Sequence, residues 1–493
     1  MIADLKPYAE YKESDAPWFG DVPVHWDVKR LGSVFGERGE TNEKYEVTEV
    51  LSVLKDIGVI PYSEKGRIGN KKSEDIGRYK IVCPDDLVVN CMNVIIGSVG
   101  RSRYTGCLSP VYYVLKRRKL ENLPRYLELV FQHKSFQRSL VRIGNGILAH
   151  RMRIPMEKLK AELIPLPPPD EQAAIVRFLD WVTGKLERAI RAKRKVIALL
   201  GEQKQAIIHH AVTRGLPAQA SAQAGLDPSV PLSACGHAQA GLKPSGIPWL
   251  GDIPQHWEAP RVKQCARKIS KGTTPSTEGR EILESGPVRF LKAENISAGR
   301  ITDKPLCFID EGTNRMIRRS QLAENDILFV IAGATLGKTA VVSLEVLPAN
   351  TNQAVAFIRP NSRVVPSFLE LWLQSPRIKE LIWLNAVQSA QPNLSMADLG
   401  NFATPVPPCN EQEQILEFVK SATKPMSEAS SRLEREIELL REYRTRLVAD
   451  VVTGKLDVRE AAARLPDEAA PDTAEDAAEL SDDPETADEE AGP

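Results

Sequence analysis

The chain contains two long helical stretches whose apolar residues fall at matching positions. In residues 186–213 the positions 186, 190, 193, 197, 200, 204, 207 and 211 step alternately by four and three, and most are apolar. This heptad spacing predicts a helix with one apolar seam, spanning roughly 40 Å. The seam recurs near the C-terminus at an offset of 240, with Arg444 in place of the polar Lys204. We expect the two helices to pack on each other through seam residues that include Ile197, Leu200, Ile207, Ile437, Leu440 and Leu447.

A second duplication precedes each helical stretch. Residues 11–26 and 242–257 share Lys, Pro, Trp, Gly, Asp, Pro, His and Trp at an offset of 231. The Pro- and Gly-punctuated pattern predicts an extended arm that docks two Trp side chains onto a domain. His25 and His256 could be catalytic, but no Ser, Cys or acidic partner accompanies them in both copies of the sequence. We therefore expect these two histidines to be structural.

A Pro-rich segment leads into each helical stretch, at residues 166–172 and 406–412. Asp170 and Asn410 are expected as N-caps of a short helix, with Glu171 and Glu411 in its first turn, followed by the long helix. Between arm and Pro-rich segment each half mixes strands with one helix. The expected strands are 47–54, 86–89, 94–99 and 111–115, then a helix over 123–141; the second half has 288–291, 327–331, 339–343 and 354–358, then a helix over 367–385.

Between these matched segments the two halves diverge strongly in sequence. A duplicated framework with different interiors is expected if two related domains bind two different targets. Duplication also favours a pseudo-two-fold arrangement, which would make the two long helices antiparallel.

Composition narrows the class of protein. No apolar run among the 493 residues approaches the ~20 needed to span a membrane. The start carries no secretory signal, and the seven scattered cysteines form no CxxC pair, which predicts a reduced cytoplasmic protein. We expect residues 217–241 to be a linker and 461–493 to be disordered, because the latter are Ala, Pro and acid without aromatics.

The formal net charge of zero hides an asymmetry. Residues 467–493 hold 12 acidic and no basic side chains, so residues 1–466 carry 65 basic against 53 acidic side chains, a net of +12. This surplus is compatible with an anionic partner such as nucleic acid, and equally with ordinary surface charge.

Two motifs point toward enzymes but fit them poorly. Gly333–Thr339 resembles a phosphate-binding loop, yet it has three residues between its glycines instead of four, and Gly97–Arg101 in the first half lacks the Lys-Thr pair. Asp170 with Glu202 and Lys204 resembles a nuclease pattern, but Glu202 and Lys204 are two apart on a helix and point to different faces. The sequence also has no Gly-rich S-adenosylmethionine loop and no amino-methylation motif.

Loops rich in amides and basic groups recur at matching places, over 144–153 and 386–393. Such side chains make paired contacts to base edges, although a polar surface loop is the alternative. Candidate DNA-binding residues there are Asn145, His150, Arg151, Arg153, Gln388, Gln391 and Asn393. Arg101 and Lys338, at the ends of the glycine turns, are candidates for phosphate contact.

Taken together, these motifs resemble one family. The paired Asp-Val/Ile-Pro-x-His-Trp arms, the Pro-rich Glu-Gln segments, the Gly333–Lys338 turn, the Gln391–Ser395 segment and the paired helices look like the DNA-specificity subunit of type I restriction–modification systems. The resemblance covers about residues 11–460. The acidic tail and the replacement of a Gln391–Ser395-like segment by 144–153 depart from the family pattern.

The resemblance implies an α+β fold with two α/β target-recognition domains, each reading one half of a bipartite asymmetric DNA site. The boundaries expected are 1–165 for the first domain, 166–216 for the central helical spacer, 217–241 for the linker, 242–405 for the second domain, 406–460 for the distal spacer and 461–493 for the tail. Two modification subunits would dock on the helices, with restriction subunits outside them. S-adenosylmethionine, ATP and Mg²⁺ would serve those partners, and none is expected in this non-catalytic, cytoplasmic chain.

Two other classes of protein remain open. One is a stand-alone methyltransferase or nuclease with fused recognition domains, which the lack of catalytic motifs disfavours. The other is a specificity subunit of a different phage-defence complex, which would share the DNA reading and differ in its partners.

Overall fold

The structure is a computed structural model that describes residues 5–66, 72–73, 75–145, 152–216, 241–297, 299–386 and 393–466. The expected linker, except Gly241, and the chain from 467 onward lie outside the described residues. The chain forms two compact units: the first comprises Met1–Ala192 and Glu436–Pro493, and the second comprises Lys193–Arg435. The division falls within the long helices, so each unit contains the beginning of one and the end of the other.

Each unit is built on a four-stranded antiparallel sheet of the same order. In the first unit the order is β4 (Phe35–Glu37), β11 (Tyr112–Arg117), β8 (Leu87–Asn90), β9 (Val99–Arg101). In the second it is β15 (Ala266–Lys271), β23 (Val355–Pro360), β20 (Ile327–Val330), β21 (Thr339–Val341). The shared order shows that the sequence duplication is a duplication of structure.

Among the smaller strand groups, the two-stranded sheet of the arm occurs in both units and the others differ. The first contains β1 (Tyr11–Lys12) with β2 (Val22–Pro23), β3 (Asp27–Arg30) with β12 (Leu163–Leu166), β5 (Leu51–Leu54) with β6 (Gly58–Pro61), and β7 (Lys80–Val82) with β10 (Gly106–Leu108). The second contains β13 (Leu242–Pro244) with β14 (Asp252–Pro254), β17 (Ile296–Ser297) with β18 (Arg300–Ile301), and a sheet of β19 (Phe308–Ile309), β16 (Val288–Leu291) and β22 (Ala349–Thr351). The pairing of β16 with β22 is parallel, whereas the strands named in the first unit all pair antiparallel and a single isolated bridge among its described residues, Val50 with Cys107, is parallel.

The helix expected at 123–141 is broken in two, as is the one expected at 367–385. The first unit has α2 (Pro124–Gln132) and α3 (Lys134–Ser139), and the second has α9 (Pro366–Leu373) and α10 (Pro376–Ala386). The first break lies at His133, whose backbone is extended and whose Nδ1 accepts a hydrogen bond from the backbone N–H of Ser135. A side chain that caps a new helix in this way ends the preceding one. In the second unit Pro376 starts the new helix, as proline commonly does.

The expected strand at 94–99 is also wrong in its first part. Residues Val94–Ile96 form a 3₁₀ turn, and Gly97 ends that turn with a φ of 104° in the left-handed region. A residue with a Cβ is disfavoured there, so the chain can reverse at this glycine and enter β9 only at Val99. Other short helices include α1 (Leu31–Val34), α4 (Met156–Ala161), α7 (Val262–Cys265), α8 (Glu311–Met316) and α11 (Met396–Asn401).

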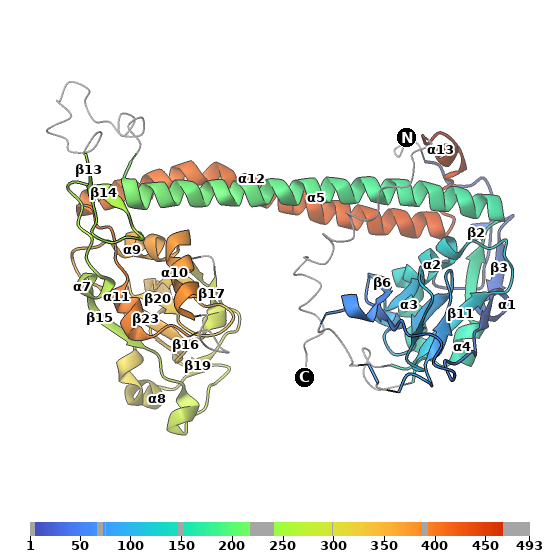
Figure 1. The fold of residues 1–493 in the computed structure, drawn as a ribbon, viewed down its shortest axis with the longest axis horizontal. Coiled ribbons are helices and arrows are strands. Elements are labelled where there is room, and N and C mark those ends of the chain that lie inside the picture. The colour runs from blue at the N-terminus through green and yellow to red at the C-terminus, as the bar shows by residue number, and fades with distance from the viewer. Residues whose placement is uncertain are drawn as a thin grey trace. The chain divides into compact units, whose positions relative to one another are not determined.

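The two longest helices are α5 (Pro169–Arg214) and α12 (Cys409–Val452), both drawn in Figure 1. The short helix expected before each long one is not separate: α5 runs unbroken for 46 residues, about 70 Å in place of the expected ~40 Å. No proline interrupts it after its first residue, and its glycines are tolerated within the helix. Asp170 lies in the first turn instead of capping it, because the helix begins at Pro169.

Within each unit the two long helices run antiparallel. In the first unit Ile175 and Phe178 near the start of α5 share a core with Leu447 and Val451 at the end of α12. In the second, the end of α5 and the start of α12 share a core through Ile208, Val212, Ile415 and Val419. The pairing predicted from the duplication is therefore confirmed in each unit.

The seam residues behave as the heptad spacing predicts. Ile437 and Leu447 are buried, and Ile197, Leu200, Ile207 and Leu440 are half-buried. The polar interruptions have partners on the opposite long helix. Lys204 Nζ donates to Ser427 Oγ at 3.1 Å, and Arg444 Nη1 pairs with Glu187 Oε1 at 2.9 Å.

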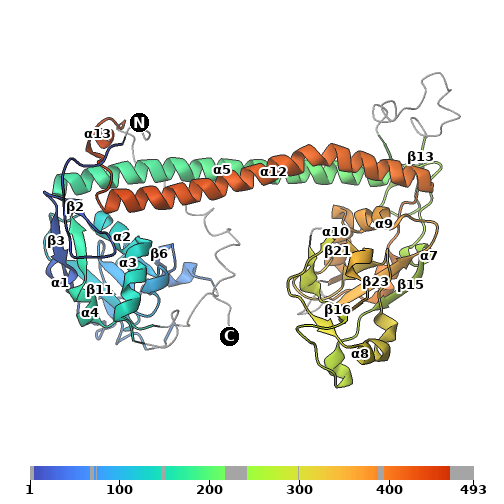
Figure 2. The same ribbon diagram turned by 180° about the vertical axis from the view of Figure 1, so that it is seen from behind.

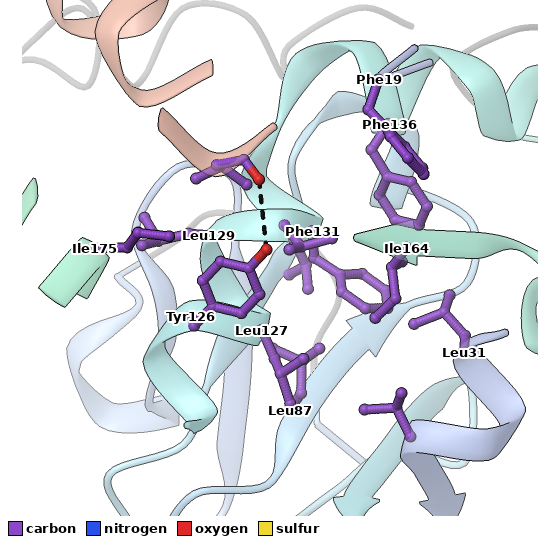
Figure 3. Packing of buried hydrophobic residues seen from close by; sticks show 14 of the residues in the cluster. Phe19, Leu31, Leu87, Tyr126, Leu127, Leu129, Phe131, Phe136, Ile164 and Ile175 are labelled. Atoms are coloured by element: carbon purple, nitrogen blue, oxygen red, sulfur yellow. Dashed lines mark hydrogen bonds between the residues drawn. The ribbon is translucent and has the colours of Figure 1, made fainter. Parts of the chain in front are cut away.

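In the first unit α2 lies between the sheet and the helix ends. Its Tyr126 is fully buried among Leu127, Phe131 and Ile164, as Figure 3 shows. The Tyr126 hydroxyl is 3.1 Å from the carbonyl oxygen of Pro165 and 3.4 Å from that of Val452 at the end of α12. One side chain thus connects α2 and the segment after β12 to the end of a long helix.

The expectation that disorder starts at residue 461 is wrong for residues 461–466. Helix α13 (Arg459–Ala463) buries Ala461 and Ala462, and Leu465 follows in the same core. Arg177 on α5 donates to the carbonyl oxygen of Leu465 at 2.9 Å, and Figure 2 shows α13 beside this part of α5. The alanines that suggested low complexity are small enough to pack between these elements.

Candidate nucleic-acid interface

A buried glutamate at the start of α5 holds the arm of the first unit. One oxygen of the Glu171 carboxylate lies 2.8 Å from Nε2 of His25. The other accepts the indole N–H of Trp26 at 2.9 Å, together with the hydroxyl of Tyr8. The glutamate side chain is 4% exposed, so these donors replace water around its charge. The positive end of the helix dipole further favours a carboxylate at this position.

The second unit repeats this arrangement at the start of α12. Glu411 lies 2.7 Å from Nε2 of His256 and accepts the indole N–H of Trp257 at 3.1 Å. The inference that the two histidines lack an acidic partner was therefore wrong, because Glu171 and Glu411 are far away in sequence. The carboxylates bind the arms instead of activating a nucleophile, since their remaining oxygen is taken by tryptophan.

The glutamine after each glutamate fixes the helix behind the sheet. Gln172 accepts the backbone N–H of Leu123 at 2.8 Å and donates to the carbonyl oxygen of Pro167 at 2.9 Å. Gln412 makes the same two bonds, with Val365 at 2.7 Å and Pro407 at 2.8 Å. Leu123 and Val365 directly precede α2 and α9, so the Glu-Gln pair ties three segments to one helix start.

A glycine at the end of the other long helix completes each arrangement. Gly454 and Gly215 have φ values of 75° and 81°, typical of a helix-ending glycine. A Cβ on Gly454 would lie 2.6 Å from Pro23 and 3.1 Å from Trp26, and one on Gly215 would lie 3.4 Å from Trp257. We call each set of arm His-Trp, helix-start Glu-Gln and helix-end Gly a junction.

The two candidate DNA-binding loops leave from the same place in each unit. In the first, Asn145 and Arg153 pair across the loop base by backbone hydrogen bonds of 2.9 and 3.0 Å, and Ile154 N–H donates to the carbonyl oxygen of Cys91. In the second, Leu394 N–H donates to the carbonyl oxygen of Ile331 at 2.8 Å. Both loops therefore meet the end of the matching strand, β8 or β20.

The described candidates in these loops are exposed. Asn145, Arg153 and Asn393 have exposed side chains, whereas His150, Arg151, Gln388 and Gln391 lie outside the described residues. Burial raises the pKa of the Cys91 thiol, and the nearby charge of Arg153 opposes this shift. The Arg153 side chain thus lies close to Cys91 at the end of β8.

The structure brings Lys338 to this strand end and leaves Arg101 elsewhere. Ala332 pairs with Asn393, and the backbone N–H of nearby Val330 donates to the carbonyl oxygen of Lys338, whose side chain is exposed. Arg101 pairs with Leu87 at the opposite end of β8, and its guanidinium binds Asp85 at 3.1 Å.

The strand register also corrects the matching of the two turns. Strands β9 and β21 correspond at an offset of 240, so Gly97 matches Gly337 and Ser98 matches Lys338. Arg101 is therefore not the counterpart of Lys338. The constant offset of 240, which the long helices also show, assigns Ser98 and not Arg101 to the position of Lys338.

Some site types are not found in the described part of the chain. Among those residues there is no cluster of three or more His, Cys, Asp or Glu side chains able to hold a metal ion. No helix among them is long and apolar enough to cross a membrane.

Comparison with known families decides the identity. The model of the type I restriction modification DNA specificity domain matches residues 23–194 and 254–439, which together make up most of the chain. The chain belongs to this family. The two matched stretches each contain one arm-end His-Trp, one Glu-Gln pair and one candidate loop.

Individual relatives agree with the family. The chain is 26% identical over 270 residues to the type I restriction enzyme EcoBI specificity subunit of Escherichia coli, which covers 53% of this chain and 52% of that protein. It is 22% identical over 481 residues to the putative type I restriction enzyme MjaX specificity subunit of Methanocaldococcus jannaschii, covering 93% of this chain and all of that protein. The chain thus spans about half the length of the first relative and the full length of the second.

The fold is also found in a solved structure. A chain from work on complex assembly and conformational transition of the type I R-M system matches 88% of this chain and 99% of its own length. The TM-score is 0.57 at 15% identity, which supports the likeness of fold alone.

Proposed function

We propose that this chain is the DNA-specificity subunit of a type I restriction–modification complex and that each unit reads one half of a bipartite asymmetric target. The observation that carries this is the contrast between matched junctions and unmatched loops. The junctions fix two sheets of the same order to the long helices, while the loops at the strand ends carry different polar side chains. A constant frame with variable reading loops suits a protein that recognises two unlike half-sites.

Alanine variants of the loops test this function. Arg151→Ala with Arg153→Ala should relax one half-site, and Gln391→Ala with Asn393→Ala the other, because a good base contact contributes ~1–3 kcal/mol of discrimination. The measurement is binding to a library in which one half-site at a time is randomised. Arg101→Ala is the matched control, since Arg101 lies away from the loop base and pairs with Asp85. Equal weakening for every sequence would make the loop residues phosphate contacts instead.

Exposed leucines support the docking of two modification subunits. Leu199 on α5 and Leu439 on α12 occupy equivalent positions at an offset of 240, and they are 54% and 63% exposed. One exposed leucine alone is common on protein surfaces, so the support comes from its repetition at the same place in both copies, which suits the same partner binding twice. Leu199→Lys and Leu439→Lys should each remove one modification subunit from the complex, measured by light scattering.

The catalytic steps belong, in this proposal, to the partners. Modification subunits would supply S-adenosylmethionine-dependent adenine methylation, and restriction subunits ATP- and Mg²⁺-dependent cleavage. The purified chain alone should then neither methylate nor cleave DNA. Methyl transfer by the isolated chain would overturn this division of roles.

The long helices are proposed to set the spacer between half-sites. Deleting one heptad from each, residues 194–200 and 434–440, keeps the seam in register and shortens each helix by ~10 Å. That length corresponds to about three base pairs at the spacing of ~34 Å per ten base pairs. DNA binding by the variant should prefer the same half-sites with a shorter spacer, and an unchanged spacer would refute the idea. α5 is about 70 Å long, roughly twice the ~34 Å between major-groove contacts one DNA turn apart, so helix length alone does not give the spacer and the deletion is the relevant test.

A further inference from the structure

The second unit contains a hollow that none of the roles above uses. It has a volume of about 740 Å³ and lies between α5, the arm and the start of α10, elements that Figure 2 shows together. The α5 side is formed by Gly201, Glu202, Gln205, Ala206 and His209; the other side by Trp249, Leu250, Pro376, Arg377 and Glu380.

The hollow is built by small residues at two α5 positions. At the offset of 240, Gly201 and Ala206 correspond to Arg441 and Arg446 on α12. A Cβ added to Gly201 would meet no atom within 4 Å, so this glycine is not required by packing inside the unit. A glycine inside a helix destabilises it by roughly 0.5–1 kcal/mol relative to alanine. α12 carries arginine at the position equivalent to Gly201, so the glycine leaves space on this face of α5 that a longer side chain would fill.

The lining is rich in hydrogen-bond acceptors. The Glu202 and Glu380 carboxylates line it, and the side-chain oxygen of Gln205 is buried without a hydrogen-bond partner among the described residues. The lining offers fewer hydrogen-bond donors than acceptors, because the Arg377 guanidinium already binds Glu380 at 2.7 Å and the Trp249 carbonyl oxygen at 2.8 Å. Burial, and next the charge of Arg377, lower the pKa of His209, which keeps its imidazole neutral at neutral pH. Because Arg377 and Glu380 offset each other, the lining carries one net negative charge, that of Glu202.

An aromatic wall completes the lining. The half-buried Trp249 is stacked on Trp372 with ring centroids 6.2 Å apart. Its counterpart Trp18 is instead buried against His133 and donates its indole N–H to the carbonyl oxygen of Leu163. In the second unit the matching carbonyl, that of Ala403, is bound by Trp372, which leaves Trp249 free of that role.

We propose that this hollow is a socket for an arginine side chain of a partner protein that docks on α5. A guanidinium offers five N–H donors to the carboxylates and the Gln205 oxygen, and its planar face stacks on tryptophan. The excess of negative charge and the unused acceptor select a cationic donor over an anionic or purely apolar group. The inference deepens the proposed function, because the natural partner on α5 would be a modification subunit.

A titration of the full-length chain tests the socket without any partner. The chain is labelled with 5-fluorotryptophan, and the Trp249 resonance is assigned with Trp249→Phe. N-acetyl-arginine amide should shift this resonance saturably at millimolar concentration, while the isosteric, neutral N-acetyl-citrulline amide should shift it at least tenfold less. Equal shifts with both compounds, or none with either, would overturn the socket.

Two double variants provide matched controls. In the first double variant, called the filled variant, Gly201→Arg and Ala206→Arg place in the hollow the side chains that α12 carries at the equivalent positions. This variant should lose the arginine-induced shift of the Trp249 resonance and keep its fold, because arginine favours helix more than glycine does. Arg441→Gly with Arg446→Ala makes the reverse change in the first unit and should leave the titration unaltered. An unchanged shift in the filled variant would locate arginine binding elsewhere and refute the proposal.

A reconstituted complex separates failure of the socket from failure of the proposed function. With modification subunits, the filled variant should associate at least tenfold more weakly than the unaltered chain. If the unaltered chain does not assemble or direct methylation, the proposed function fails, whereas the titration still decides the socket. Unweakened association of the filled variant would overturn the partner assignment.

Discussion

The junctions of the two units are nearly interchangeable, whereas the structures they support differ. Glu171 and Glu411 hold a His-Trp pair with bonds that agree within 0.2 Å. Above the junctions the first unit has the β5–β6 hairpin, and the second has a three-stranded sheet with a parallel pair. The residues that hold the arm are thus kept in both copies, whereas the strand groups beyond them have diverged although they too are largely buried.

Removing an arm tryptophan should give the largest effect on this comparison. Trp26 and Trp257 are completely buried, and replacing either by alanine leaves a cavity and an unpaired glutamate oxygen. We expect each variant to lose ~3–5 kcal/mol of unfolding free energy, measured by urea denaturation. Because the junctions match, the two losses should be similar. A loss below 1 kcal/mol in one of them would show that its junction is not integral to the fold.

The second-largest effect on the free energy of unfolding is expected from His133, at a position where only the first unit has a histidine. Burial lowers the pKa of His133 to about 4, while the corresponding residue of the second unit is Ser375. Between pH ~6.5, the pKa of this histidine in the unfolded chain, and pH 4, the unfolded chain binds a proton at His133 and the folded chain does not. The free energy of unfolding therefore falls as the pH is lowered through this range. The total loss is roughly 3 kcal/mol at 1.36 kcal/mol per pKa unit.

His133→Asn isolates this contribution. Asparagine keeps an acceptor for the Ser135 N–H and does not titrate. The difference in unfolding free energy between the unaltered chain and the variant should therefore become smaller or change sign between pH 7 and pH 4. A difference that stays constant over this range would contradict a depressed pKa at His133.

The junction glutamates should differ in a way that sharpens the comparison. Glu171 has three side-chain donors, including Tyr8, whereas two are described for Glu411. Replacing each by glutamine puts an amide N–H where an acceptor is needed, at a cost of ~1–3 kcal/mol. We expect Glu171→Gln to cost more than Glu411→Gln in thermal unfolding. The opposite order would mean that the Tyr8 bond contributes nothing.

The parts of the fold that the sequence predicts are those repeated at a constant offset. The long helices, their seam and the docked arms follow from heptad spacing and from matched Pro, Trp and Gly residues. The helix breaks at His133 and Pro376 were missed, because apolar spacing continues across them and only local capping stops the helix. The periodicity of apolar residues predicts which face of a helix is buried. It does not predict where a local capping hydrogen bond ends the helix.

The candidate site is predicted less completely. The candidate loops were identified because amides and basic groups recur in both halves, and the structure puts Asn393 and Lys338 at one strand end; their contact with DNA stays a prediction. The glutamate partners of His25 and His256 were missed because they are about 150 residues away in sequence. Arg101 was misplaced because glycine patterns were matched instead of strand register. Pairings between distant segments are set by the topology, which local motifs do not reveal.

The smallest effect on the free energy of unfolding is expected at the polar positions of the helix seam, where the two units match position by position. Arg444 pairs with Glu187, and at the equivalent positions Lys204 donates to Ser427. The side chains of Arg444 and Glu187 are 40% and 47% exposed, so their ion pair should contribute less than ~1 kcal/mol. Arg444→Met and Lys204→Met should each change unfolding free energy by under ~1 kcal/mol. Only the first change should depend on salt, because the ion pair is screened and the Lys204–Ser427 bond lacks a second charge. Measuring both variants in 0.05 and 1 M NaCl distinguishes the pairs: a salt dependence shared equally by both would mean that the seam senses the overall charge of the helices instead of this one pair.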